Sequence, residues 1–436
     1  MEHGKCNYMK HIVNEGKTLL VDGPASVILL SGDVNVLGAP LQIKKNLVVR
    51  QGKRLPFWIN KTATLEVMLG EGAAINEVDV EWAVPFSWVA AAKQLLCLDK
   101  PVTVMVLGGV DSGKTSFCTF LANAAVTEKL KTGVIDADLG QSDVGPPSTI
   151  GFNFVTAPVK DLFEIDAQYA DFVGSTSPSG VISKIIDGLT YLKTKVIEAD
   201  ADFLVINTDG WVEGEEAAAY KVQLTQKTAP SAVVGLDKGN ELTPILDALH
   251  GTKVILIASP QLIHPRSREK RKLLRELSYK KYLKGAKIQS LSLSWVKVKN
   301  SLLGSGRQLR RKRLETLSSL LESRPVYSEE NVAVLLVVLK KSEFVTEEQL
   351  KAAEEHFGKR VKVVWDGDEE GLLVGLKDEE DNFLGIGILH EVDYSRKALK
   401  VYTPVSEKVF TVCFGQIKLD KNCRETGLST VYTNEL

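Results

Sequence analysis

Residues 108–115 read GGVDSGKT, a run whose residue types can bind phosphate. Glycines let backbone N–H groups curl around phosphate oxygens, a lysine can reach the β- and γ-phosphates, and a hydroxyl at the start of a helix can hold Mg²⁺. Lys114 and Thr115 supply the last two groups. The alternative is a glycine-rich turn on an ordinary strand–helix unit. We predict that a nucleotide binds along this loop, through Gly108, Gly109, Val110, Asp111, Ser112, Gly113, Lys114, Thr115 and Ser116.

Two acids end the next apolar segment, residues 132–138 (TGVIDAD). Asp136 and Asp138 are two residues apart, so they point the same way from an extended chain. One carboxylate of such a pair can order Mg²⁺ while the other accepts the proton of an attacking hydroxyl. The alternative is a solvated loop with incidental acids. We predict a metal site made of Thr115, Asp136 and Asp138.

A tryptophan lies on a glycine-containing loop, residues 207–214 (NTDGWVEG), after a third apolar segment. The carboxyl ends of neighbouring parallel strands converge on one crevice, so this loop is expected near the phosphate loop. There Trp211 can offer its flat face to a base, and such stacking needs no particular base sequence. Ordinary packing of the ring is the alternative.

A strongly basic segment follows at residues 265–285, PRSREKRKLLRELSYKKYLKG. Arg271 and Arg275 are four residues apart and project from one helical face. A basic helix above a phosphate loop can supply positive charge to a migrating phosphoryl group, contact an RNA backbone, or be a solvated surface. The run at 307–313 (RQLRRKR) has comparable alternatives: a nuclear address, an RNA patch or exposed surface.

The elements that must position these residues alternate between strand and helix from about residue 100 to residue 290. This pattern predicts an α/β domain with a parallel sheet covered on both faces and a ligand at the carboxyl ends of its strands. A connecting helix is expected at 85–98, with Ser87 at its start. Strands are expected at 102–107, 132–138, 202–208, 231–237 and 253–259, and helices at 116–130, 181–198, 215–228 and 243–249.

Both flanking regions are richer in strands. Short alternating segments and glycine turns at 16–80 predict a small antiparallel β domain without helices. Beyond about residue 289 a second β-rich region contains one expected helix, 346–357, which begins with a TEEQ capping signature. We predict three domains: an N-terminal β domain at 1–84, a central P-loop domain at 85–290 with a lid helix at about 264–287, and a C-terminal β-rich domain at 291–436. His264 is expected in a loop.

The bulk composition is that of an ordinary globular protein, with 44% hydrophobic and 25% charged residues among 436. A net charge of -1 provides no attraction of the whole molecule to nucleic acid, so any such affinity must be local. No signal peptide or membrane-length apolar run is found, so no membrane association is expected. Five cysteines without CxxC spacing favour a reducing compartment over a disulfide framework or a zinc site: Cys6, Cys97, Cys118, Cys413 and Cys423.

Five segments in this order and spacing resemble the polynucleotide 5′-hydroxyl-kinase family: GGVDSGKTS, DADLGQSDVGPPSTIG, FVGSTSPSG, NTDGWVEG and RSREKRKLLRELSYKKYLKG. That family includes RNA kinases of pre-mRNA 3′-end cleavage, tRNA splicing and pre-rRNA processing. The likeness extends into the N-terminal and C-terminal parts and therefore covers most of the chain. Its compact form is most similar to the archaeal branch. The expected location is therefore the cytoplasm for an archaeal source and the nucleus for a eukaryotic one.

The resemblance implies an ATP-dependent kinase that uses Mg²⁺ and phosphorylates the 5′-hydroxyl end of single-stranded or duplex RNA, and of DNA as a second substrate. It also implies protein partners in RNA processing, and recognition of adenine by the N-terminal β domain. Lys114, Asp138, Arg271 and Arg275 match the family's catalytic positions, with Asp138 as the base and the arginines in the lid. Four residues match its substrate-binding and metal-shell positions: Gln141, Thr208, Gly210 and Trp211.

Two other functions are compatible with a phosphate loop. A scaffold that binds ATP without turnover would hold partner proteins together, but it has no need of lid arginines. A GTPase would need an NKxD-type guanine motif after a late strand. Residues 235–242 (GLDKGNEL) offer Asp237 and Lys238 without the second aspartate, which argues against a GTPase.

Overall fold

The computed structural model describes residues 8–262 and 265–429, and the chain forms two compact units. The first comprises Met1–Asp171 and Ser177–Arg275, and the second comprises Phe172–Thr176 and Glu276–Leu436. The first unit contains both the N-terminal sheet and the central sheet, so the finer division at 84/85 and 290/291 stays a prediction. No helix among the described residues is long and apolar enough to cross a membrane. His264 lies outside the described residues.

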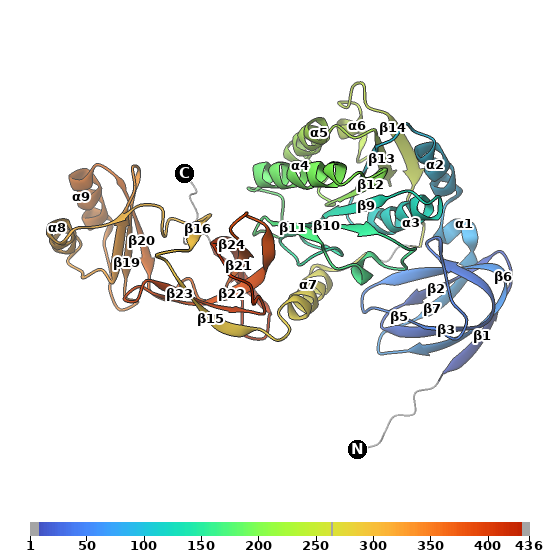
Figure 1. Ribbon diagram of the computed structural model, residues 1–436, viewed down its shortest axis with the longest axis horizontal. Helices are drawn as coiled ribbons and strands as arrows, with labels where there is room; N and C mark the ends of the chain where they lie inside the picture. The colour runs from blue at the N-terminus through green and yellow to red at the C-terminus, as the bar shows by residue number, and fades with distance from the viewer. Residues whose placement is uncertain (1–7, 263–264, 430–436) are drawn as a thin grey trace, which may run out of the picture. The chain divides into compact units, whose positions relative to one another are not determined.

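The N-terminal part of the first unit is a seven-stranded antiparallel sheet (Figure 1). Its strands follow the order β4-β3-β6-β2-β7, with β1 beside β6 and β5 beside β3. Alternation of buried and exposed side chains along β3 and β6 gives the sheet one packed face. The elements are β1 (Met9–Val13), β2 (Lys17–Asp22), β3 (Ala25–Val36), β4 (Ala39–Pro40), β5 (Asn46–Val49), β6 (Arg54–Leu69), β7 (Ile75–Asp79) and the short helix α1 (Val80–Ala83).

The central sheet has seven strands in the order β11-β10-β9-β12-β8-β13-β14. The five strands expected from the sequence are the parallel ones, and every residue of β8, β9 and β12 is buried, as continuous apolar runs predict. Strand β10 was not anticipated: it pairs antiparallel with β9 and, with β11, extends one edge. The strands are β8 (Val102–Gly108), β9 (Thr132–Ala137), β10 (Thr149–Val155), β11 (Tyr169–Phe172), β12 (Phe203–Thr208), β13 (Ala232–Asp237) and β14 (Val254–Ala258).

Helices cover this sheet, and two of them, α2 and α3, also pack against the N-terminal sheet. Buried residues of α2 and α3 share one hydrophobic core with both sheets, and Trp88 meets Phe117 edge-on at 5.3 Å. The predicted cap of α2 is wrong: Pro85 occupies the cap position, and the Ser87 hydroxyl instead accepts a bond from the Ala258 N–H. The helices are α2 (Phe86–Leu96), α3 (Lys114–Thr127), α4 (Ile182–Glu198), α5 (Glu215–Thr228) and α6 (Thr243–Leu246). A further helix, α7 (Arg268–Tyr282), follows β14, and its residues from Glu276 onward belong to the second unit.

The second unit contains a larger mixed sheet, β15-β23-β22-β21-β24-β16 with β25 beside β24, and a four-stranded sheet, β17-β18-β19-β20. The capping box at Thr346 and Gln349 is present, which confirms the expected start of α9. The strands are β15 (Lys287–Ser292), β16 (Lys297–Lys299), β17 (Arg307–Gln308), β18 (Tyr327–Glu330), β19 (Val334–Leu339), β20 (Arg360–Trp365), β21 (Leu372–Lys377), β22 (Phe383–Asp393), β23 (Ala398–Thr403), β24 (Thr411–Leu419) and β25 (Glu425–Leu428).

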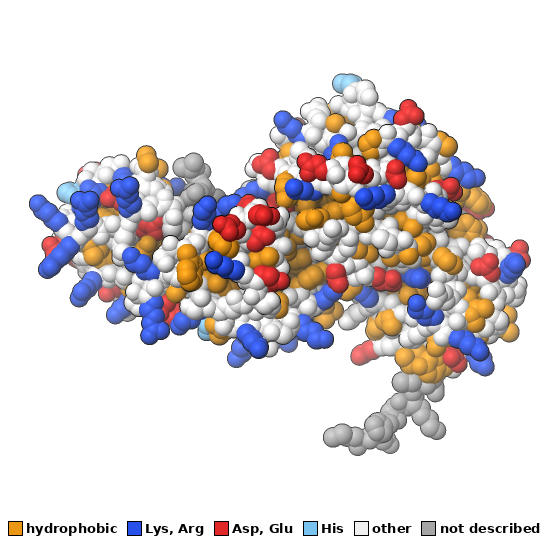
Figure 2. Space-filling view, in the orientation of Figure 1, with side chains coloured by type: hydrophobic (Ala, Val, Ile, Leu, Met, Phe, Trp, Pro, Cys, Tyr) orange, Lys and Arg blue, Asp and Glu red, His pale blue; other side chains and the backbone are white. Residues whose placement is uncertain are grey.

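The expectation of a single helix in this region is wrong, because α8 (Arg311–Leu321) precedes α9 (Glu347–Phe357). Leu317 and Leu321 bury the inner face of α8, while the basic residues at its start are exposed. Lys and Arg side chains gather on this part of the second unit (Figure 2). The sequence pattern did not indicate this helix, because α8 begins with three basic residues and its apolar positions start only after them.

Candidate functional site

The phosphate loop connects β8 to α3 in a tightly wound backbone. Gly113 precedes the helix with φ 97°, and Asp111 also has a positive φ of 53°. A side chain at Gly108 would lie 2.6 Å from Ser112 Oγ and 2.8 Å from Leu236 O, so only glycine fits there. The sequence therefore places the amides of the loop at the amino end of α3, where anions bind.

Two polar side chains of this loop are buried with incomplete partners. Lys114 Nζ donates to the Gly109 carbonyl at 2.7 Å, and burial lowers the pKa of this lysine to about 8, an effect that Asp138 opposes. Ser112 Oγ is buried and finds no hydrogen-bond partner within the described ranges. Phosphate oxygens would satisfy both groups, so the loop fits a nucleotide.

Asp136 is a buried anchor at the end of β9. Its Oδ2 accepts the N–H of Asp143 at 2.7 Å and of Val144 at 3.3 Å, and its Oδ1 accepts Asn207 Nδ2 at 2.9 Å. Burial, with the nearby charges of Asp138 and Asp143, raises the pKa of Asp136 to about 7 despite these bonds. Asp136 therefore holds the following loop from inside the protein.

Asp138 lies one residue beyond the strand and is only partly buried. Its Oδ1 accepts the N–H groups of Gly140 and Gln141 at 3.1 and 3.0 Å, while no donor from the described residues reaches Oδ2. Burial raises the pKa of Asp138, Lys114 opposes the shift and Asp209 adds to it. An available oxygen on a carboxyl of raised pKa suits a proton acceptor or a metal ligand.

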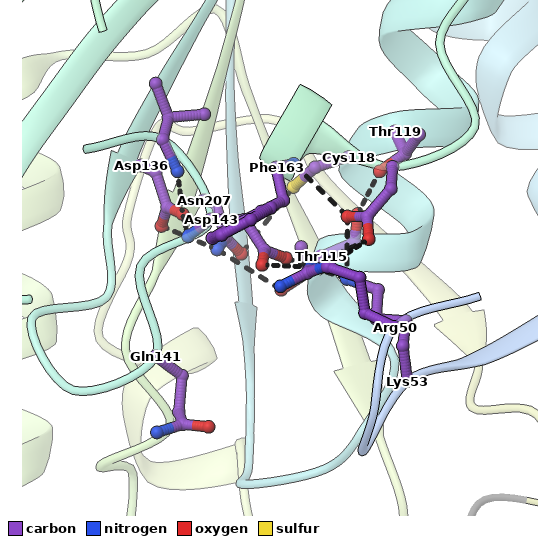
Figure 3. Close-up of polar contacts among 12 residues, drawn as sticks. Arg50, Lys53, Thr115, Cys118, Thr119, Asp136, Gln141, Asp143, Phe163 and Asn207 are labelled. Atoms are coloured by element: carbon purple, nitrogen blue, oxygen red, sulfur yellow. Dashed lines mark hydrogen bonds and ion pairs between the residues drawn. The ribbon is translucent and has the colours of Figure 1, made fainter. Parts of the chain in front are cut away.

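Asn207 is a residue of this site that the sequence did not single out. Its Nδ2 also lies 3.4 Å from Thr115 Oγ1, so one amide connects the hydroxyl at the start of α3 to Asp136 (Figure 3). Asn207 pairs in register with Val106 of β8 and Asp136 of β9. The sequence signal that could have identified Asn207 is its position, since it is a polar residue at the carboxyl end of a buried strand.

The loop after β12 rests on a buried ion pair. Lys221 Nζ and Tyr220 Oη, both buried on α5, donate to Asp209 Oδ2 at 2.7 and 2.8 Å. Asp209 Oδ1 accepts the Trp211 N–H at 2.9 Å, and the half-buried Trp211 ring lies 5.9 Å from the Tyr220 ring. This ion pair therefore fixes the backbone that presents Trp211.

Gly210 and Thr208 take different places in that loop. A side chain at Gly210 would lie 2.8 Å from Val110 N, so the loop contacts the phosphate loop closely. The Thr208 hydroxyl is fully buried and donates to the Val106 carbonyl at 2.8 Å. This bond links β12 to β8, and the predicted contact of Thr208 with the substrate stays a prediction.

The basic helix α7 begins at Arg268 and ends at Tyr282, which is shorter than the predicted 264–287. Ser267 Oγ accepts the Lys270 N–H at 3.1 Å and so caps the helix start. Arg271 Nη1 lies 3.5 Å from Asp111 Oδ2 on the phosphate loop. Arg275 follows one turn later on the same helix.

Asp111 and Gln141 connect the start of this segment to the site. Asp111 Oδ2 accepts the Arg266 N–H at 2.9 Å, and Gln141 Oε1 accepts Arg266 Nη1 at 3.5 Å. Gln141 Nε2 donates to the Arg271 carbonyl at 3.2 Å. The structure thus brings Gln141, Asp111 and Arg271 together, and adds Arg266, which the sequence did not single out.

Comparisons with known proteins agree with this geometry. Residues 108–285 match the family model described as mRNA cleavage and polyadenylation factor CLP1 P-loop. The polyribonucleotide 5′-hydroxyl-kinase of Methanocaldococcus jannaschii is 30% identical over 335 residues, which cover 76% of this chain and 90% of that protein. The kinase of the same name from Pyrococcus furiosus is 29% identical, with 81% and 98% covered.

Eukaryotic relatives and solved structures extend the likeness. A CLP1 homologue of Nematostella vectensis is 27% identical over 284 residues, covering 60% of this chain and 65% of that protein. The structure of a wild-type Clp1p–Pcf11p complex superposes with a TM-score of 0.66 at 12% identity, covering 95% of this chain and 99% of that one. At that identity the superposition establishes the fold alone.

Proposed function

This chain belongs to the family of the archaeal polyribonucleotide 5′-hydroxyl-kinases and the CLP1 proteins, and we propose that it is an ATP-dependent polynucleotide 5′-hydroxyl kinase. It would transfer the γ-phosphoryl group of ATP to the 5′-hydroxyl end of RNA, giving a 5′-phosphate and ADP. One observation supports this most: Asp138, with an available carboxylate oxygen, interacts electrostatically with Lys114 of the phosphate loop, and the lid arginine Arg271 contacts Asp111 of the same loop.

The nucleotide side of the site would use the phosphate loop and two oxygen ligands. Lys114, Ser112 and the amides of the loop would bind the phosphates. Thr115 and Asp138 would hold Mg²⁺, and Asp136 would support them from inside through Asn207. When bound, ATP provides the phosphoryl group and Mg²⁺ neutralises its charge. The residues of the chain orient the phosphates, and Asp138 Oδ2 stays available to the metal or to the acceptor hydroxyl.

The acceptor side would use Asp138 and the loop after β12. A 5′-hydroxyl is a weak nucleophile, so positioning and a nearby proton acceptor carry the reaction. Asp138 would take the hydroxyl proton, Gly210 and Trp211 would hold the terminal nucleotides with Thr208 behind them, and Gln141 would complete the metal shell. Arg271 and Arg275 would neutralise the transferred group.

Further properties follow from the relatives. Their names support RNA as the substrate. We propose that the RNA is bound in single-stranded or duplex form and that DNA is a second substrate. The solved Clp1p is a complex with Pcf11p, and we propose that this chain also works with protein partners in RNA processing.

The test is transfer of label from γ-labelled ATP to a 5′-hydroxyl oligoribonucleotide in the presence of Mg²⁺. We expect label at the RNA 5′ end. Asp138→Asn should abolish transfer and leave ATP binding nearly unchanged, because it removes the proton acceptor and keeps the phosphate loop. Wild-type protein that labels neither RNA nor DNA would contradict the proposal. Protein that retains ATP without turnover would instead favour the scaffold function.

A further inference from the structure

A turn of the N-terminal sheet lies beside the candidate site. It connects β5 to β6 and is closed by a bond from the Lys53 N–H to the Arg50 carbonyl at 3.1 Å. Gly52 within it has φ 76°, the left-handed backbone that such a turn favours in glycine. We call residues 50–54 the β5–β6 turn. This turn is not part of the phosphate loop, the acid-bearing loop or the lid, but it belongs to the same unit of the protein as the candidate site.

Two cations of the β5–β6 turn face two acids of the central domain. Arg50 Nη2 lies 2.7 Å from both Asp143 Oδ1 and Asp161 Oδ2, and its Nε donates to Asp161 at 2.8 Å. Lys53 Nζ lies 2.7 Å from Asp143 and 3.1 Å from Asp161. The Arg50 guanidinium also stacks 3.9 Å above the Phe163 ring. The four charges balance one another within a largely buried cluster.

The ionisation of Asp143 reflects this cluster. Burial opposes the charged form, but Lys53 and Arg50 hold the pKa of Asp143 well below its usual range. The Asp143 side chain is therefore stabilised as a carboxylate, with one oxygen on Arg50 and the other on Lys53.

From Asp143 a continuous path of hydrogen bonds leads to the phosphate loop. The Asp143 N–H donates to Asp136 Oδ2 at 2.7 Å, Asn207 donates to Asp136 Oδ1 at 2.9 Å, and Asn207 Nδ2 lies 3.4 Å from Thr115 Oγ1. Figure 3 shows this path from the cations to Thr115. The bonds end on the hydroxyl that is proposed to hold Mg²⁺.

The same turn also contacts the lid segment. A side chain at Gly52 would lie 2.9 Å from Leu274 Cδ2 on α7. Arg54 makes a two-bond contact with Asp22, at 2.7 and 2.6 Å, and its Nη1 donates to the Leu262 carbonyl at 2.7 Å, just before the lid. The β5–β6 turn thus supports the acid-bearing loop on one side and the lid on the other.

We propose that Arg50 and Lys53 are positioning residues for phosphoryl transfer, through which the N-terminal sheet sets the geometry of Asp136, Asn207 and Thr115. This inference rests on the proposed kinase function. A buried ion cluster contributes little net stability, because desolvation of the charges offsets their attraction. Its bonds instead hold the side chain of Asp143, whose own N–H donates to Asp136 on the metal side of the site. Outer partners of metal ligands act in this way.

The experiment compares Arg50→Met, Arg50→Lys and a control in the full-length protein. The control is Lys17→Met, which removes the Lys17–Asp79 ion pair (2.6 Å) elsewhere in the same sheet. Two quantities are measured: kcat for RNA phosphorylation as a function of Mg²⁺, and hydrogen exchange of the Asp143 and Val144 amides without nucleotide.

Arg50→Met should lower kcat, or raise the Mg²⁺ needed for half-maximal rate, by about 10- to 100-fold. The KM for ATP should change by less than about threefold, because the phosphate loop is untouched. The two amides should exchange faster. Arg50→Lys should show a smaller change in kcat or Mg²⁺ dependence and a smaller change in amide exchange. Lys17→Met should change neither quantity.

Unchanged exchange at these two amides in folded Arg50→Met overturns the inference, even if wild-type protein transfers no phosphate. Unchanged kcat and Mg²⁺ dependence in an active protein also overturn it. Absence of transfer by wild-type protein counts against the proposed kinase function instead. If Arg50→Met fails to fold, the balanced variant Arg50→Met/Asp161→Asn replaces it, since it keeps the Lys53–Asp143 pair. For this double variant too, unchanged amide exchange, or unchanged kcat and Mg²⁺ dependence, would overturn the inference.

Discussion

The loops after β9 and β12 leave neighbouring parallel strands, and each is anchored by a buried aspartate in a different way. Asp136 is held by backbone N–H groups and the Asn207 amide, with no cation bonded to it among the described residues. Asp209 is held by the buried Lys221 and by Tyr220. Neutral donors leave Asp136 with a raised pKa, whereas a lysine supplies a full counter-charge.

The comparison shows two ways to fix a loop beside a reactive site. In both loops the buried aspartate lies two residues before the group proposed to act, Asp138 in one and Trp211 in the other. Anchoring by neutral donors makes the first loop sensitive to pH. Anchoring by a buried ion pair makes the second sensitive to loss of either partner.

Breaking the ion pair of the second loop should lower the free energy of unfolding more than any other change considered below. Lys221→Met leaves Asp209 buried without its counter-charge, which costs about 3–5 kcal/mol of unfolding free energy. Chemical denaturation of the nucleotide-free protein measures it. Lys221→Met/Asp209→Asn should recover much of the loss, because no uncompensated charge remains. A loss below about 1 kcal/mol in the single variant would mean that the pair does not anchor the loop.

A smaller effect should appear when pH is varied around Asp136. The pKa is about 7 when folded and has its ordinary value of 3.8 when unfolded, so the folded protein binds more protons between these values. This contribution to stability is therefore full below about pH 4 and is lost as pH rises toward 7, by at most about 1.4 kcal/mol per pH unit. Denaturation between pH 5 and 6.5, without nucleotide or metal, measures the slope.

Asp136→Asn is the matched control for that slope, since it removes the titrating group and keeps the side-chain shape. The variant should lose stability less steeply with rising pH than wild type. Equal slopes would show that Asp136 is already ionised at pH 5 in the folded protein. Asp143 does not interfere, because its lowered pKa lies below the window.

A third prediction concerns the contact between the second loop and the phosphate loop. Gly210→Ala places a methyl group 2.8 Å from Val110 N, so one backbone must shift, at about 1–3 kcal/mol. We expect weaker ATP binding by calorimetry together with this loss of stability. Gly239→Ala is the control, because nothing lies within 4 Å of its added methyl group. Identical ATP affinities in the two variants would mean that the loops are independent.

Much of the secondary structure could be predicted from local sequence patterns. The unbroken apolar runs of β8, β9 and β12 indicated buried parallel strands, and TEEQ indicated the capped start of α9. Strand β10 and helix α8 were missed, since antiparallel pairing at an edge and a helix that starts with charges leave weak periodic signals. Arg266 was overlooked, because its role depends on a contact with Asp111 that lies far away in sequence.

Local sequence was enough for the phosphate loop, for the five parallel strands of the central sheet, and for the residue types that gather at the carboxyl ends of those strands. These depend on local conformation and on hydrophobic period. Tertiary packing made Asp136 an anchor, left Asp138 with an available oxygen, and bonded the Thr208 hydroxyl to the Val106 carbonyl. It also brought Arg50 and Lys53 to Asp143, across about ninety residues of chain. Burial and hydrogen-bond partners depend on what packs around a side chain, and a linear pattern does not contain that information.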